Sequence, residues 1–128
     1  MKRFILSVAF SLLCLSAVNA QWQAKHNMSP ADYQTFATDC TNQGMRPISV
    51  SGYTVNGSER YAALYEKTNG PAWVTKHGMS GSDFQNQFNT LGAQGYQLTF
   101  ISGYEVGGQP KFAAIWEKKN DNYIAKFG

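Results

Sequence analysis

The stretch from Trp22 to Ala72 reads WQAKHNMSPADYQTFATDCTNQGMRPISVSGYTVNGSERYAALYEKTNGPA, and a second version of it follows directly. That version, from Trp73 to Tyr123, reads WVTKHGMSGSDFQNQFNTLGAQGYQLTFISGYEVGGQPKFAAIWEKKNDNY. The two align without a gap, and nineteen of the fifty-one residue pairs are identical. A fixed period of this size is typical of one supersecondary unit used twice. The sequence therefore predicts a single domain over residues 21–128, made of two repeats at 22–72 and 73–123.

Each repeat carries the signals of one amphipathic helix. A serine that can cap a helix stands three residues before an aspartate, as Ser29 does before Asp32. Apolar residues then recur at helical spacing until a glycine that suits a left-handed cap. These signals predict one helix of about fourteen residues in each repeat, ending before Gly44 and Gly95.

Two stretches rich in β-branched and aromatic residues follow each helix, joined by a dipeptide that suits a tight hairpin turn. They are residues 47–55 and 60–67 in the first repeat, and residues 98–106 and 111–118 in the second. The later stretch of each pair is apolar on both faces, which predicts a central strand. Gly52 and Gly103 interrupt the earlier stretches and indicate a bulge or a close backbone approach.

A shorter strand is expected to open each repeat, at residues 22–26 and 73–77, and residues 123–127 resemble it a third time. We therefore expect an α+β fold in which each unit is a helix followed by a three-stranded antiparallel meander. In this prediction the start of the next unit supplies the third strand, and residues 123–127 close the second sheet. The helices cover one face of the sheets in a pseudo-symmetric domain.

The first twenty residues have the pattern of a secretory signal peptide. Lys2 and Arg3 precede an apolar run over residues 4–18, and small residues end at Ala20. The run is shorter than the roughly twenty residues of a spanning helix, so we expect secretion to the extracellular space and no membrane partner. Without residues 1–20 the chain keeps nine basic and eight acidic residues and no basic run, which argues against nucleic acid as a partner.

Cys40 is the one cysteine after the predicted leader. It aligns with Leu91, which lies on the apolar stripe of the second predicted helix. We therefore expect Cys40 to fill a core position, with an intermolecular disulfide or a nucleophilic role as the alternatives.

The sequence offers little support for catalysis or for a metal. His26 and His77 are the only histidines and are weak metal candidates, because two ligands are fewer than zinc or copper sites need. Residue 127 aligns with them and is phenylalanine, which favours aromatic packing at this position. The capping serines are already explained by the helices, so we predict no catalytic residue and no cofactor, and an enzyme is the less favoured class.

Aromatic residues are the best binding candidates, because flat rings contact sugars and peptide surfaces at low entropic cost. Tyr53 and Tyr104 stand beside glycines near the hairpin turns, which favours the surface, and the three tryptophans Trp22, Trp73 and Trp116 are further candidates. The alternative is that the strand aromatics pack under the helices. Asn27 and Asn56 fit the glycosylation pattern, which matters only in a eukaryotic host.

Several spaced features of the second repeat carry a family resemblance: Trp73, Lys76 to Met79, Ser102-Gly103-Tyr104, and Phe112 to Lys118. The chain resembles the bacterial tandem repeat domain of about fifty residues, the non-catalytic part of polyglycine hydrolases and related secreted serine hydrolases. The first copy departs from that pattern at Met45 and Tyr65. In those hydrolases the catalytic domain carries a Ser-x-x-Lys motif, and no serine of this chain has a lysine three residues later. The resemblance thus implies the accessory module alone.

The leading hypothesis is a secreted, non-catalytic binding module for an extracellular protein or glycan. A small secreted hydrolase or a hydrolase-associated subunit is the first alternative. A structural protein that assembles end to end into a homo-oligomer is the second, because repeat units expose sticky ends unless they are capped.

Overall fold

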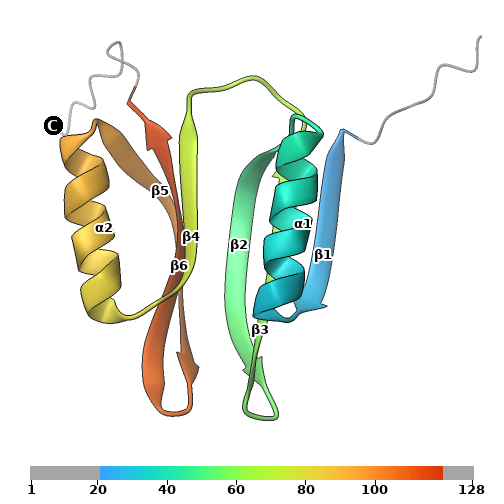
Figure 1. Cartoon of the computed structure of the whole chain (residues 1–128), viewed down its shortest axis with the longest axis vertical. Coiled ribbons are helices and arrows are strands. Elements are labelled where there is room, and N and C mark those ends of the chain that lie inside the picture. The colour runs from blue at the N-terminus through green and yellow to red at the C-terminus, as the bar shows by residue number, and fades with distance from the viewer. Residues whose placement is uncertain (1–20, 120–128) are drawn as a thin grey trace, which may run out of the picture.

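The computed structural model describes residues 21–119, which form two units of the same make-up (Figure 1). The first unit contains β1 (Trp22–Met28), α1 (Pro30–Asn42), β2 (Arg46–Val55) and β3 (Ser58–Glu66). The second contains β4 (Trp73–Met79), α2 (Gly81–Ala93), β5 (Tyr96–Val106) and β6 (Gln109–Lys118). The predicted α+β class, with two tandem repeats of one helix and three antiparallel strands, is confirmed. The expected leader, residues 1–20, and the expected closing strand, residues 123–127, lie outside the described residues.

The strand connections differ from the prediction. The sheets have the orders β1-β3-β2 and β4-β6-β5, with every pair antiparallel. Each opening strand pairs within its own unit, so Trp22 lies opposite Glu66, and Trp73 lies opposite Glu117. The expectation that the next unit supplies the third strand is therefore wrong. Because the helix carries the chain across the sheet face before β2 begins, β3 can enter between β1 and β2, and it is the central strand that its apolar composition predicts.

Both helices begin and end as their sequences require. The Ser29 hydroxyl accepts the Asp32 backbone N–H at 3.1 Å, and the Ser80 hydroxyl accepts that of Asp83 at 3.1 Å. In α2 the Asp83 carboxylate also accepts the Ser80 N–H at 3.2 Å, which completes a capping box. Gly44 and Gly95 follow the last helical turns at φ values of 78° and 85°, a conformation that glycine adopts without strain.

Each sheet has a helix side, against which its own helix packs, and a back side. On the helix side of the first sheet, Tyr61 and Tyr65 pack against Tyr33 and Phe36 of α1. Cys40 is fully buried in the same cluster, as the alignment with Leu91 predicted. These contacts show that the first unit's strand aromatics mostly form the core.

The two units pack head to tail. Alternate residues of β6 belong to different cores: Ala114 and Trp116 lie under α2, whereas Ala113 and Ile115 join the cluster that contains α1. The back of the second sheet therefore covers the helix side of the first sheet, beside α1. Figure 1 shows the second unit beside the first, with β2 next to β4 and β6. Among the described residues, no element covers the back of the first sheet or the part of the second sheet's helix side beyond α2.

No helix within residues 21–119 combines the length and the apolar character that crossing a membrane demands.

We expect Ile115→Ala to lower the free energy of unfolding by about 2–4 kcal/mol, because it opens a cavity in a buried junction. Ile115 is 1% exposed, whereas Ile101 on the other side of the same sheet is 46% exposed. The matched Ile101→Ala change should cost less than about 1 kcal/mol. Urea unfolding followed by circular dichroism measures both, and equal losses would contradict the head-to-tail packing.

Candidate functional site

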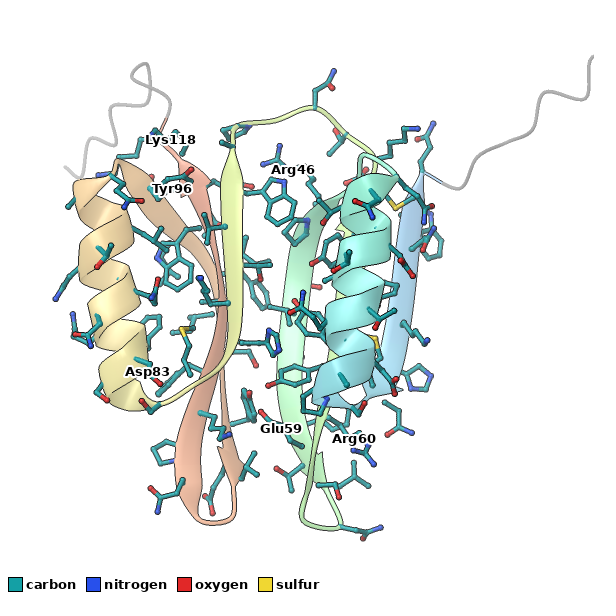
Figure 2. The ribbon with its side chains drawn as sticks, in the orientation of Figure 1. Arg46, Glu59, Arg60, Asp83, Tyr96 and Lys118 are labelled. Atoms are coloured by element: carbon teal, nitrogen blue, oxygen red, sulfur yellow. The ribbon has the colours of Figure 1, made fainter. Side chains whose placement is uncertain are left out.

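The junction between the units holds two polar clusters, marked in Figure 2 by Arg46 and Glu59 at opposite ends of the space between the units. Arg46 is the one buried charged side chain within the described part of the chain. Its guanidinium donates to the Pro71 carbonyl at 2.8 Å and to the Glu117 carboxylate at 3.1 Å. A side chain at Gly70 would overlap the guanidinium. Arg46 thus ties the linker and the second sheet to the first unit.

The second polar cluster is built around Glu59. One of its carboxylate oxygens accepts the hydroxyl of Tyr61 and, at 2.8 Å, that of Tyr104, so the two hydroxyl oxygens lie close together on the same acceptor. The Lys111 ammonium lies 3.6 Å from the other oxygen. His77 packs edge-on against the ring of Tyr61 and against Tyr33 of α1. Charge, hydroxyls and rings from both units meet here.

Burial and hydrogen bonding shift the titration of this cluster. Burial raises the pKa of Tyr61 and raises that of Tyr104 to about 12. Burial alone raises the pKa of Glu59, but the two tyrosine hydroxyls and Lys111 together lower it. Burial lowers the pKa of His77, against a smaller opposing effect of the Glu59 carboxylate. Glu59 is therefore held as an anion and His77 as a neutral ring, an arrangement that fixes the junction.

The back of the first sheet is an open, mainly apolar surface, which we call the outer back face. Trp22 stands at its margin with 63% of its surface exposed. A shallow hollow of about 260 Å³ occupies its middle. Residues lining that hollow come from all three strands of the sheet and include Ala24, His26, Ser49, Ser51, Ala62 and Leu64.

The uncovered surface of the second sheet is its helix side, and we call it the outer helix face. Phe88 of α2 and Ile101 of β5 are 45% and 46% exposed there, beside the half-buried rings of Phe84 and Phe112. The rings of Phe84 and Phe88 lie 6.1 Å apart. The described residues thus end in two different apolar surfaces at opposite ends of the repeat stack.

The predicted tyrosine and tryptophan sites fall in different places. Trp22 is on the outer back face, where it can meet a ligand. Trp116 is 1% exposed under α2, so the expectation that it binds a ligand is wrong in this fold. Trp73 packs against Tyr65, and Tyr104 packs into the junction, so neither presents a free ring. Tyr53 is half-buried, and its hydroxyl accepts the Asn27 N–H at 2.7 Å.

The two histidines do not come together. His77 lies against the helix side of the first sheet, in the junction, whereas His26 lies on the back of that sheet. Residues 21–119 contain no group of three or more histidine, cysteine or acidic side chains that could hold a metal ion. Asn27 and Asn56 are both exposed at positive φ, Asn27 at the irregularity within β1 and Asn56 in the β2–β3 hairpin turn.

Sequence reasoning missed Arg46, Glu59 and Lys111. The signal that could have found Arg46 and Glu59 is divergence between the repeats, because their counterparts are Gln97 and Pro110, whereas Lys111 aligns with Arg60 and gives no such signal. A charge present in one copy alone has a partner that the other copy lacks. Here that partner is the neighbouring unit.

Taken together, the fold and its junction define a tandem α+β repeat protein whose units stack through unlike faces. A family model described as the polyglycine hydrolase-like structural repeat matches residues 19–68 and again residues 70–119. The chain belongs to this family of structural repeats, which confirms the resemblance seen in the sequence. No curated protein matches the chain.

The cluster around Glu59 predicts that acid weakens the fold. His77 and Glu59 both have a lowered pKa when folded, so the unfolded chain binds more protons as pH falls, first below the ordinary histidine value of 6.5 and then below the glutamate value of 4.5. We expect Tm to fall from about pH 7.5 to about pH 5.5, and His77→Phe to flatten that decline by keeping an uncharged ring. His26→Phe, on the exposed back face, should leave the slope unchanged. Circular dichroism melts measure it, and an unaltered decline in His77→Phe would refute the assignment.

Proposed function

We propose that the chain is a secreted, non-catalytic binding module that holds a protein partner on its outer back face. The observation that carries this proposal is the equivalence of this face to one already engaged within the chain. Ala62 and Leu64 are half-buried on the open face, whereas their counterparts Ala113 and Ile115 are fully buried by the other unit. The repeat therefore uses this side of its sheet to contact protein.

The composition of the face favours protein over glycan. A sugar site usually combines a ring with several polar groups that fix the hydroxyls. Here the wall of the hollow combines three alanines and a leucine with Lys25, His26, Ser49 and Ser51, but it contains no aromatic residue other than the histidine. The exposed ring of Trp22 stands at the margin of the face and not in the hollow. An exposed apolar patch with a large aromatic residue is typical of an interaction surface. Secretion follows from the expected leader, and the absence of a Ser-x-x-Lys motif from the sequence supports a non-catalytic role.

The test is capture by the immobilised chain, from residue 21 onward, of proteins secreted by the source cells and of a panel of insoluble polysaccharides. We expect retained protein, and at least about a tenfold loss of retention in Trp22→Ala. Val55→Ala is the matched control, because Val55 is 42% exposed at a hairpin tip and lines no part of the hollow.

Two results would overturn the proposal. Retention that Trp22→Ala leaves intact would remove the outer back face from the site. Retention confined to polysaccharides would make the module a glycan binder.

A further inference from the structure

A tripeptide shared by both repeats, Ser-Gly-Tyr, holds the junction together. The Gly52 N–H of β2 donates to the Ser102 hydroxyl of β5 at 3.1 Å. The Tyr104 ring lies on Gly52 so closely that any side chain there would overlap it. Thr54, two residues further along β2, donates its hydroxyl to the Glu105 carbonyl. The junction thus uses the glycine of the first tripeptide with the serine and tyrosine of the second.

The residues of the two tripeptides that the junction does not use are Ser51 and Tyr53 of the first and Gly103 of the second. They lie at opposite ends of the described residues. Ser51 lines the hollow of the outer back face, and Tyr53 lies on the same side of its strand. The Tyr53 hydroxyl accepts the Asn27 N–H, and the corresponding N–H, that of Gly78, lies beside the Tyr104 hydroxyl. Tyr53 is therefore held as Tyr104 is held in the junction, ready to cover a glycine.

Gly103 is the glycine left uncovered. It lies on the outer helix face, its φ is not positive, and a side chain there would meet only the Phe112 ring at an ordinary 3.5 Å. Nothing in residues 21–119 requires glycine at this position. A tyrosine from another molecule, placed as Tyr104 is placed on Gly52, would require it.

The burial of apolar residues shows the same relation between the junction and the two outer faces. Val50, beside Gly52 on the first sheet, is 0% exposed because the second unit covers it, whereas its counterpart Ile101 is 46% exposed. Ala62 and Leu64 are likewise more exposed than Ala113 and Ile115. The apolar residues left open in each unit are those that the junction covers in the other.

The side chains that differ between the two surfaces differ in complementary ways. At the junction, Ala37 of α1 borders a groove of about 220 Å³ lined also by Trp73 and Thr75. On the outer helix face the position of Ala37 is taken by the larger Phe88, and on the outer back face the position of Thr75 is taken by the smaller Ala24. The larger ring thus has a smaller neighbour opposite it and can occupy the groove that the internal junction leaves open.

We propose that a second copy of this chain docks its outer back face onto the outer helix face of the first, repeating the internal junction between molecules. This inference rests on the proposed function and names the partner of its surface. The contact is heterologous, since each copy contributes a different face, and it can continue into a chain of molecules or close into a ring.

The contact between copies lacks the polar clusters of the internal one. Glu59 and Tyr61 are replaced by Pro110 and Phe112 on the outer helix face, and Arg46 by Gln97. Neither the carboxylate that gathers two hydroxyls nor the buried ion pair recurs. The association is therefore driven by apolar burial, is weaker than the internal junction, and depends little on salt.

The test uses the purified chain from residue 21 onward and two variants that each place a charge on one face. Trp22→Glu disrupts the outer back face, and Ile101→Glu disrupts the outer helix face. In sedimentation velocity over about a hundredfold concentration range, the mass of the unaltered chain should rise, with little effect of salt. Each variant alone should weaken the association at least about tenfold. An equal mixture of the two should form a dimer, because each retains the face that the other has lost, and should grow no further.

Matched controls separate docking from misfolding. Thr90→Glu adds the same charge at an exposed position of α2 whose counterpart in α1 is Asp39, and it should associate like the unaltered chain. Gly103→Ala meets no clash within the molecule, so it should fold normally and still weaken association. Circular dichroism confirms that every variant is folded.

Three outcomes would overturn the inference. A constant monomer mass at every concentration would do so, including the case in which residues 120–128 of the same chain cover the outer helix face. If such a monomer still captured another protein through Trp22, the proposed function would hold without self-association. Undiminished self-association of Ile101→Glu would indicate a symmetric contact through the back face only. Dissociation by high salt would show that charges, rather than the apolar faces, hold the copies together.

Discussion

The structure depends on one burial event, in which Ala113 and Ile115 of the second sheet enter the core of the first unit. A three-stranded sheet with one helix has two faces to cover and one helix to cover them with. The first unit's own helix leaves part of its sheet bare, and the back of the next sheet completes that core. Small domains have little apolar surface to bury, so a face shared between units is worth more here than in a large protein. Covering this face therefore contributes to the stability of the first unit.

The polar clusters fix how the units meet. Two units held by apolar surfaces alone could slide or rotate against each other. The hydrogen bonds of the Arg46 guanidinium and the Glu59 carboxylate form in one relative orientation of the units. Arg46 takes its partners from the linker and the second unit, Pro71 and Glu117. Glu59 takes Tyr104 and Lys111 from the second unit, besides Tyr61 of its own strand. Burying such groups costs desolvation, which their hydrogen bonds offset only when the geometry is met. The clusters therefore contribute orientation to a contact whose free energy comes mostly from Val50, Ile115 and their neighbours.

Much of the fold could be read from the sequence, because its signals are local. Caps, hairpin dipeptides and apolar spacing placed each helix and strand to within a few residues, and the comparison of Cys40 with Leu91 placed a buried thiol. The pairing of β1 with β3 could not be read, since the next unit begins with the same kind of strand and competes for the same partner in any sequence argument. The candidate site could be predicted from the sequence even less well. Trp116 lies in a strand that the sequence predicts to be central and apolar on both faces, so the sequence does not say which face its ring takes, and the packing of α2 buries it. Trp22 begins an edge strand, on a face that no element of residues 21–119 covers.

Identity between repeats and difference between repeats carry separate information. Residues that both copies share, such as those of Ser-Gly-Tyr, serve the two sides of one contact, so each copy exposes the half that its neighbour does not use. Residues that differ, such as Glu59 against Pro110, mark what is specific to the internal contact. A chain that ended its stack by simple capping would be expected to replace the shared residues at its ends with polar ones. Here Gly103, Ile101 and Phe88 remain at one end and Trp22, Ser51 and Tyr53 at the other. The two ends of the described residues therefore keep the shape of a junction, while the outer helix face lacks the charges that Arg46 and Glu59 supply inside the chain.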